Sequence, residues 1–218
     1  MARIVTALKR QKRRQSRVSV FLDEEYAFSL EEIIASRLGL GQALDDEEIA
    51  ALQQEDDANR AQERALRLLE HRPRTRAELV QRLRRAGYAD EAIDQALERL
   101  ERVGLVDDEA FARFWVEQRL AFRPRGRRAL RYELRQRGVA NHIISRVLEN
   151  VSDSEAAAAF VQRYLAKPRE TPSEETRDRL LSLLRNRGFD YHTAKEALEE
   201  LLLAGDSSAV PDNPYESE

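Results

Sequence analysis

The same pattern of apolar and polar positions occurs three times along this chain. Each copy has a leucine four residues before a glycine, an apolar residue directly after the glycine, and further apolar positions six, ten and thirteen residues beyond it. The copies contain Gly87, Gly138 and Gly188, so the repeat length is 51 and then 50 residues. A period of this length indicates one supersecondary unit that is repeated and that buries its apolar face against its neighbours.

Each repeat divides into three helices. In the first repeat, a long helix that begins at Asp45 ends near His71, a second runs from a cap at Thr75 to Gly87, and a third is capped by Asp90. Prolines at 73, 124, 168 and 172 separate the first two helices of the repeats, since proline interrupts a helix. The glycines fit helix ends, where the residue after the last turn adopts a left-handed conformation that glycine tolerates best.

The first 44 residues have a different pattern. Residues 17–28 alternate apolar and polar positions around a turn, which predicts a β-hairpin packed through Val18, Val20, Phe21 and Phe28. Residues 4–9 predict a third, edge strand. Residues 29–32 then read as a capping box that opens a short helix ending at Gly39.

These patterns predict a mainly α-helical protein built from three tandem three-helix repeats in an elongated, curved array, preceded by a small β-containing block. The predicted parts are residues 1–44 (hairpin and short helix), 45–104 (repeat one with its long first helix), 105–151 (repeat two), 152–205 (repeat three) and 206–218 (a disordered tail).

Composition narrows the class of protein. The chain has 218 residues, of which 35% are charged, and no cysteine, which excludes disulfides and thiolate chemistry. No apolar run has the roughly 20 residues that a membrane-spanning helix needs, nor does the start resemble a signal peptide. We therefore expect a cytoplasmic protein that does not enter membranes and is a monomer.

The sequence offers little for catalysis. Its one GxG, Gly39-Leu40-Gly41, lacks the further residues of a phosphate-binding loop. His142 and His192 occupy the same repeat position, which fits two surface residues better than two ligands of one metal. We expect no catalytic residues, no metal and no cofactor.

Arginine is the most informative residue type. Although the net charge of the chain is −3, its central segment is basic, since residues 59–152 contain 21 arginines and 14 acidic residues. On a helix after Pro124, four arginines fall on one face while Leu130 and Leu134 face the core. A solvated surface is the simpler reading of any single charge, but clusters at equivalent places in two repeats favour a polyanion or an acidic protein surface. The candidate binding residues are Arg119, Arg123, Arg125, Arg127, Arg128, Arg131 and Arg135 in repeat two, and Arg82 and Arg85 in repeat one.

Aromatic residues near this basic stretch allow two readings. Phe111, Phe114, Trp115, Phe122 and Tyr132 could stack on bases, as in proteins that bind single strands. Because part of this set falls at helical spacing beside apolar residues, packing between repeats is the preferred reading. We expect Trp115 to be a core residue.

The order and spacing of these motifs resemble the RecX family. The residues that carry the resemblance are Ala65 to Leu69, Arg72, Arg76 to Leu83, Gly87, Gly104 to Asp108, Phe111, Ala112, Trp115, Arg119, Gly126, Leu134 and Gly138, together with Ser19 to Asp23 and Phe28 to Leu30. The resemblance covers about 200 residues and is strongest between residues 65 and 151. Repeat three departs from it at Ala194, where the other copies have isoleucine.

The resemblance implies a regulator that binds the RecA recombinase filament on single-stranded DNA and inhibits ATP hydrolysis and strand exchange, with no catalytic activity of its own. Its contact with single-stranded DNA is either direct or made through the filament. This role would place it in recombination, DNA repair and the SOS response. The alternative is a helix-turn-helix transcription regulator, because three-helix units with a glycine-bearing turn are also typical of that class.

Overall fold

The computed structural model describes residues 2–12, 16–164 and 173–206, and side chains as far as residue 200. The described chain forms two compact units, residues 1–107 and 108–218. The strands are β1 (Arg3–Arg10), β2 (Arg17–Leu22), β3 (Glu25–Glu31) and β4 (Ala43–Leu44). The helices are α1 (Glu32–Ala35), α2 (Asp46–His71), α3 (Arg76–Arg85), α4 (Asp90–Arg102), α5 (Asp108–Phe122), α6 (Arg127–Gln136), α7 (Asn141–Leu148), α8 (Asp153–Tyr164), α9 (Glu174–Asn186) and α10 (Tyr191–Asp206).

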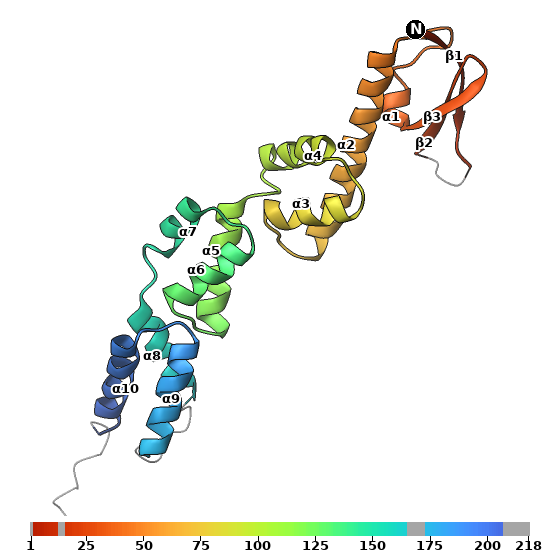
Figure 1. Cartoon of the computed structure of the whole chain (residues 1–218). Coiled ribbons are helices and arrows are strands. Elements are labelled where there is room, and N and C mark those ends of the chain that lie inside the picture. Colours follow the sequence, from red (N-terminus) through yellow and green to blue (C-terminus); the bar gives the residue numbers. More distant parts are fainter. Residues whose placement is uncertain (1, 13–15, 165–172, 207–218) are drawn as a thin grey trace, which may run out of the picture. The chain divides into compact units, whose positions relative to one another are not determined.

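The N-terminal block is an antiparallel sheet with strand order β3-β2-β1-β4, which lies beside the first half of α2 in Figure 1. The predicted hairpin is present, and Val18, Val20 and Phe28 are buried. The prediction for Phe21 is wrong: strand alternation places it on the opposite face, edge-on to Tyr26 with ring centroids 6.0 Å apart. β1 is the predicted third strand, but the prediction that it is an edge strand is wrong, because β4 pairs with its first residues Arg3 and Ile4.

The predicted capping box at residues 29–32 is also wrong. Ser29 and Glu31 belong to β3, and the helix that follows has only four residues and no side-chain cap. The alternating burial of β3 extends to Leu30, and residues 29 to 31 pair with β2. Because their backbone groups are used in the sheet, the helix begins only after Glu31.

In the first unit, α2, α3 and α4 form repeat one. α2 begins where predicted, with a capping box of Asp45 and Glu48, and Thr75 caps α3 as predicted. Asp90 is not a cap: Ala89 holds that position without a side-chain bond, and the Asp90 carboxylate instead accepts two hydrogen bonds from Arg84 at 2.6 and 3.0 Å.

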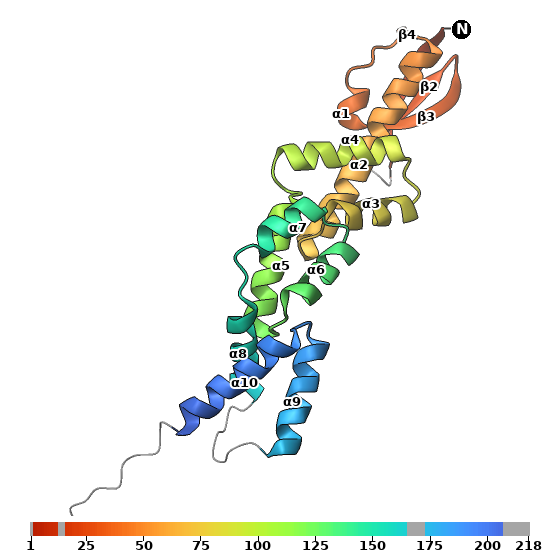
Figure 2. The ribbon, with the colours of Figure 1, turned by 60° about the vertical axis from the view of Figure 1, so that its left-hand side comes forward.

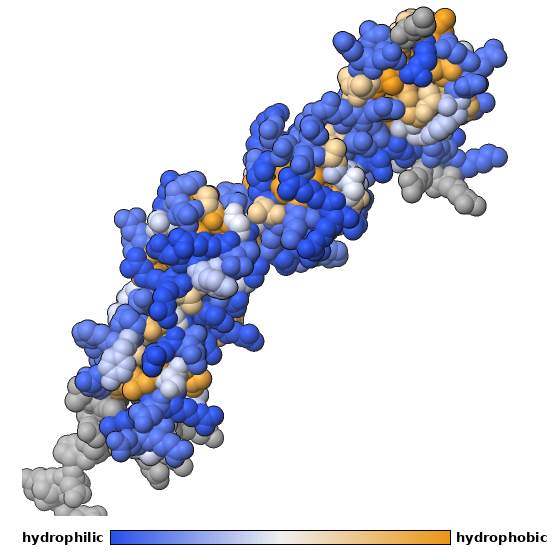
Figure 3. All heavy atoms as spheres, in the orientation of Figure 1, coloured by the Kyte–Doolittle hydropathy of each residue, from blue (hydrophilic) through white to orange (hydrophobic). Residues whose placement is uncertain are grey.

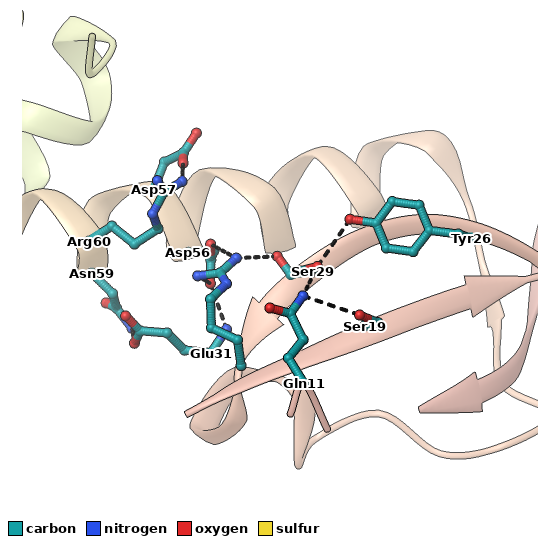
Figure 4. Close-up of polar contacts among 10 residues, drawn as sticks. Gln11, Ser19, Tyr26, Ser29, Glu31, Asp56, Asp57, Asn59 and Arg60 are labelled. Carbon is teal, nitrogen blue, oxygen red and sulfur yellow. Dashed lines mark hydrogen bonds and ion pairs between the residues drawn. The ribbon is translucent and has the colours of Figure 1, made fainter. Parts of the chain in front are cut away.

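Polar contacts join the sheet to α2 (Figure 4). The carboxylate of Asp56 is buried and accepts hydrogen bonds from the Arg17 guanidinium at 2.9 Å and from the backbone N–H of Glu31 at 2.6 Å. Asn59, one turn along α2, donates to the Glu31 side chain at 3.2 Å and accepts from Arg99 of α4 at 2.6 Å. Burial raises the pKa of Glu31. The sheet, α2 and α4 are therefore linked by one chain of hydrogen bonds.

In the second unit, α5 to α7 form repeat two and α8 to α10 form repeat three (Figures 1 and 2). The equivalent leucines Leu83, Leu134 and Leu184 are fully buried in their repeats. The three repeat glycines have φ values of 89°, 78° and 89°, which confirms the predicted left-handed helix ends.

The two prolines of repeat three, Pro168 and Pro172, and the predicted tail from residue 207 onward lie outside the described residues. None of the described helices has the length and apolar character needed to cross a bilayer. The face drawn in Figure 3 is predominantly hydrophilic over the helical repeats.

Candidate polyanion-binding surface

Helix α6 presents the arginines that the sequence singled out. Leu130 and Leu134 are fully buried in the core of repeat two, so the opposite side of the helix faces solvent. The arginines on that side form the α6 stripe: Arg127, Arg128, Arg131 and Arg135. Arg131 is half-buried, and the other three are exposed. Within the described part of the chain, none of these four guanidiniums is paired with a carboxylate.

A comparison with repeat one explains why no carboxylate in the described part of the chain pairs with the α6 stripe. There, Arg84 binds Asp90, and Arg76 binds Asp94 at 2.7 Å and Glu101 at 2.9 Å. Its hydrogen bond to Asp94, followed by the charge of Glu101, raises the pKa of Arg76 above its ordinary value.

In repeat two, the corresponding arginines are retained and the acids are replaced. Fifty-one residues further on, Arg127 and Arg135 occupy the positions of Arg76 and Arg84, whereas the three acids become Asn141, Ser145 and Ser152. The side chain of Arg135 still donates to residue 141, at 2.8 Å from Asn141 Oδ1, but it meets a neutral amide. Repeat two thus keeps the positive charges without the negative ones.

Glu133, the one acidic residue of this stretch, organises a second group of side chains. Its carboxylate accepts hydrogen bonds from Trp115 Nε1 at 2.7 Å and Arg119 Nε at 2.8 Å, and it lies 3.0 Å from Arg125 Nη1. The guanidiniums of Arg119 and Arg137 lie over the Trp115 ring, 4.3 and 3.7 Å from its centroid. Arg119 and Arg125, both predicted binding residues, are therefore each paired with an internal carboxylate, although the Arg125 side chain remains 35% exposed.

The prediction that Trp115 is a core residue is confirmed only in part, since it packs against the core without being fully buried. It is half-buried at the edge of the core, stacked on Phe111 with its N–H bonded to Glu133, and so supports a charged cluster rather than filling the core. Phe114, Phe122 and Tyr132 are exposed, which is contrary to a packing role and leaves their rings accessible.

The repeat-one candidates Arg82 and Arg85 lie exposed on α3. Near them, Arg74 is buried, donates from Nε to the Leu68 carbonyl at 3.0 Å, and lies 3.9 Å from Glu78. Burial lowers the pKa of Arg74, and the charges of Arg72 and Arg82 lower it further.

A short motif that the sequence reasoning missed connects the two repeats. Arg72-Pro73-Arg74 and Arg123-Pro124-Arg125 are 51 residues apart, and each forms the corner between the first two helices of its repeat. In both, the second arginine is near a glutamate of the following helix, Glu78 or Glu133. The motif could have been found in the sequence, because the same Arg-Pro-Arg tripeptide occurs twice at the 51-residue spacing of Gly87 and Gly138.

The chemistry of this surface is that of anion binding. Guanidinium groups on a helix face bind phosphate or carboxylate in a bidentate manner and keep their charge at any physiological pH. Among the described residues, no group of three or more histidine, aspartate or glutamate side chains is arranged to hold a metal ion.

Comparisons with known proteins agree on one family. Family models match residues 3–45 as the regulatory protein RecX N-terminal domain, 61–100 as the first RecX three-helix domain and 107–148 as the second. The matches correspond to the sheet block, repeat one and repeat two.

Individual relatives carry the same name. The chain is 31% identical over 210 residues to the regulatory protein RecX of Bacillus licheniformis. This alignment covers 94% of this chain and 80% of that protein. The chain is also 41% identical over 152 residues to the regulatory protein RecX of Thermobifida fusca. This alignment covers 66% of this chain and 82% of the relative.

Solved structures show the same fold. A crystal structure of a regulatory protein RecX superposes with a TM-score of 0.69 at 25% identity, covering 90% of this chain and 99% of that one. RecX from Lactobacillus salivarius, at 22% identity, gives a TM-score of 0.59 over 68% of this chain and 98% of that chain.

Proposed function

This chain belongs to the RecX family, and from that premise we propose that it is a non-catalytic regulator of the RecA recombinase. It binds the RecA filament on single-stranded DNA and inhibits ATP hydrolysis and strand exchange. It acts as a cytoplasmic monomer without a cofactor, and it modulates recombination, DNA repair and the SOS response.

The observation that carries this proposal is the α6 stripe. A RecA filament on DNA offers phosphates and acidic side chains in a regular array, and four arginines that have no carboxylate partner among the described residues are suited to such a surface. The exposed Arg82 and Arg85 extend the proposed contacts to repeat one, while Arg119 and Arg125 support the surface from within.

The mechanism follows from the repeated architecture. Rigid helical units that contact several filament subunits oppose the rearrangement that each hydrolysis or pairing step requires. Many modest contacts, linked in one chain, give a stable complex although each alone is weak. The alternative of a transcription regulator is not favoured, since RecX relatives match over most of the chain.

The test is a variant in which the four arginines of the α6 stripe are replaced by alanine. We expect it to fold, since exposed side chains contribute little to stability, and to need at least about tenfold more protein to suppress DNA-dependent ATP hydrolysis by RecA. The matched control removes four exposed arginines elsewhere: Arg64, Arg102, Arg163 and Arg179. Full inhibition by the α6 variant at wild-type concentration would contradict the proposed role of this surface.

A further inference from the structure

Repeats two and three meet backbone to backbone at two glycines. A Cβ on Gly126 would lie 2.6 Å from the carbonyl oxygen of Gly188, and a Cβ on Gly188 would lie 2.6 Å from the Cβ of Ala129. The Gly126 N–H donates to the Arg187 carbonyl at 3.0 Å. Figures 1 and 2 both show the start of α6 beside the turn between α9 and α10. No side chain fits between the two segments, so their flanking residues are brought side by side.

The flanking residues are arginines from both repeats. Arg125 precedes Gly126, Arg187 precedes Gly188, and Arg123 lies just before Pro124 at the same corner. We call Arg123, Arg125 and Arg187 the junction cluster. The Arg187 guanidinium lies over the Phe160 ring, with 4.4 Å from Cζ to the centroid.

Among the described residues, the acidic groups near the junction cluster already have hydrogen-bond partners. Glu133 binds Trp115 and Arg119 as well as Arg125. Asp153 accepts a hydrogen bond from the backbone N–H of Arg127 at 2.7 Å, so it caps the start of α6. Arg123 and Arg187 have no carboxylate partner in the described chain, and the Nε of Arg125 is buried without a hydrogen-bond acceptor there.

Mutual repulsion within the cluster is consistent with this charge imbalance. The pKa of Arg187 is lowered first by burial and then by the charges of Arg125 and Arg123. An anion bound by these guanidiniums would offset that repulsion.

We propose that the junction cluster is a binding site for a backbone phosphate of single-stranded nucleic acid, formed jointly by repeats two and three. Phe122 directly precedes Arg123 in the chain and is 71% exposed, so it offers an aromatic ring on which an unpaired base could stack while its phosphate meets the arginines. A duplex, whose bases are already stacked, lacks this second interaction. The inference rests on the proposed function, since it assigns to this site part of the binding of DNA.

The experiment measures binding of the full chain to a fluorescein-labelled oligo-dT by anisotropy, at several salt concentrations and without RecA. The double variant Arg123→Gln and Arg187→Gln should bind about tenfold more weakly at low salt, and its log-log salt slope should fall by about 0.7 for each phosphate that the variant no longer neutralises. The matched control, Arg163→Gln with Arg179→Gln, removes the same charge from exposed positions of repeat three and should change affinity less than about twofold. Thermal melts establish that both variants are folded.

Two further arms identify the ligand. Labelled duplex of the same length should bind the wild-type chain more weakly than oligo-dT, and pyrophosphate should raise the melting temperature of the wild type but not of the junction variant. Equal reductions of oligo-dT affinity in both double variants would overturn the site, as would unchanged binding by the junction variant. A pyrophosphate effect without any effect on oligo-dT would overturn the nucleic-acid assignment. RecA inhibition is assayed separately, so a chain that binds oligo-dT through the junction but leaves RecA active would refute the proposed function alone.

Discussion

At the scale of single residues, Glu133 determines which arginines are available. Its side chain is only 14% exposed, and its carboxylate pairs with the positive charges of both Arg119 and Arg125. Replacing it by glutamine should destabilise the protein by about 2 kcal/mol, because charge-assisted hydrogen bonds are removed and the two guanidiniums stay partly buried. The same change should increase affinity for oligo-dT, since two cations are released from their internal anion.

The measurements are a denaturant unfolding curve and an anisotropy titration. Glu117→Gln is the control: it removes the same charge from an exposed position of α5 and should alter stability by less than about 0.5 kcal/mol. Equal effects of the two substitutions on stability would show that the Glu133 hydrogen bonds contribute nothing.

The residues that could be predicted from the sequence are those whose role is local or periodic. Leu134 is buried because of its place in the repeat, and Gly138 adopts positive φ because a helix ends there. The role of Glu133 depends on Trp115 and Arg119, which belong to another helix and approach it only after packing. A linear pattern gives the charge of such a residue but not its partners.

At the scale of elements, the repeats share a fold but differ in electrostatics. The third helix of repeat one carries Asp90 and Asp94 against the arginines of α3, whereas α7 carries Asn141 and Ser145. Restoring the acids by Asn141→Asp with Ser145→Asp should create ion pairs with Arg135 and Arg127. We expect RecA inhibition to weaken several-fold although no arginine is removed, because the α6 stripe becomes neutralised as α3 already is.

The control for this variant is Asn150→Asp with Ser182→Asp, which adds the same charge at exposed positions outside α7. It should inhibit RecA nearly as well as the wild type. If inhibition falls equally in both variants, net charge matters and the pairing between α6 and α7 does not. The comparison is made at two salt concentrations, since screening reduces any general charge effect.

The elements also show where sequence patterns fail. The helices of the repeats follow from apolar periodicity, the helix predicted to begin at Asp45 does so, and Thr75 caps the next helix as predicted. Ser29 and Glu31 have the spacing of a capping box, but their place in β3 is decided by pairing with Ser19 and Arg17 of β2. Local capping signals are therefore overridden where a sheet supplies the backbone partners.

At the scale of the whole molecule, the chain divides between Asp107 and Asp108 into two units, each of which contains two hydrophobic cores of its own. The first holds the sheet block and repeat one, with Arg82 and Arg85. The second holds the α6 stripe and the junction cluster. If both units contact the filament, the peptide bond that joins them raises the effective concentration of the second unit once the first has bound.

Separate fragments of residues 1–107 and 108–218 test this linkage. Each should unfold cooperatively, because each contains its own cores. The second fragment should bind oligo-dT with nearly the affinity of the full chain, since it contains both basic surfaces of repeats two and three. An equimolar mixture should inhibit RecA only at concentrations at least about tenfold above those of the intact chain, because the two binding events are no longer linked. Inhibition by the mixture equal to that of the intact chain would show that the units act independently, and inhibition by the second fragment alone would assign the whole activity to repeats two and three.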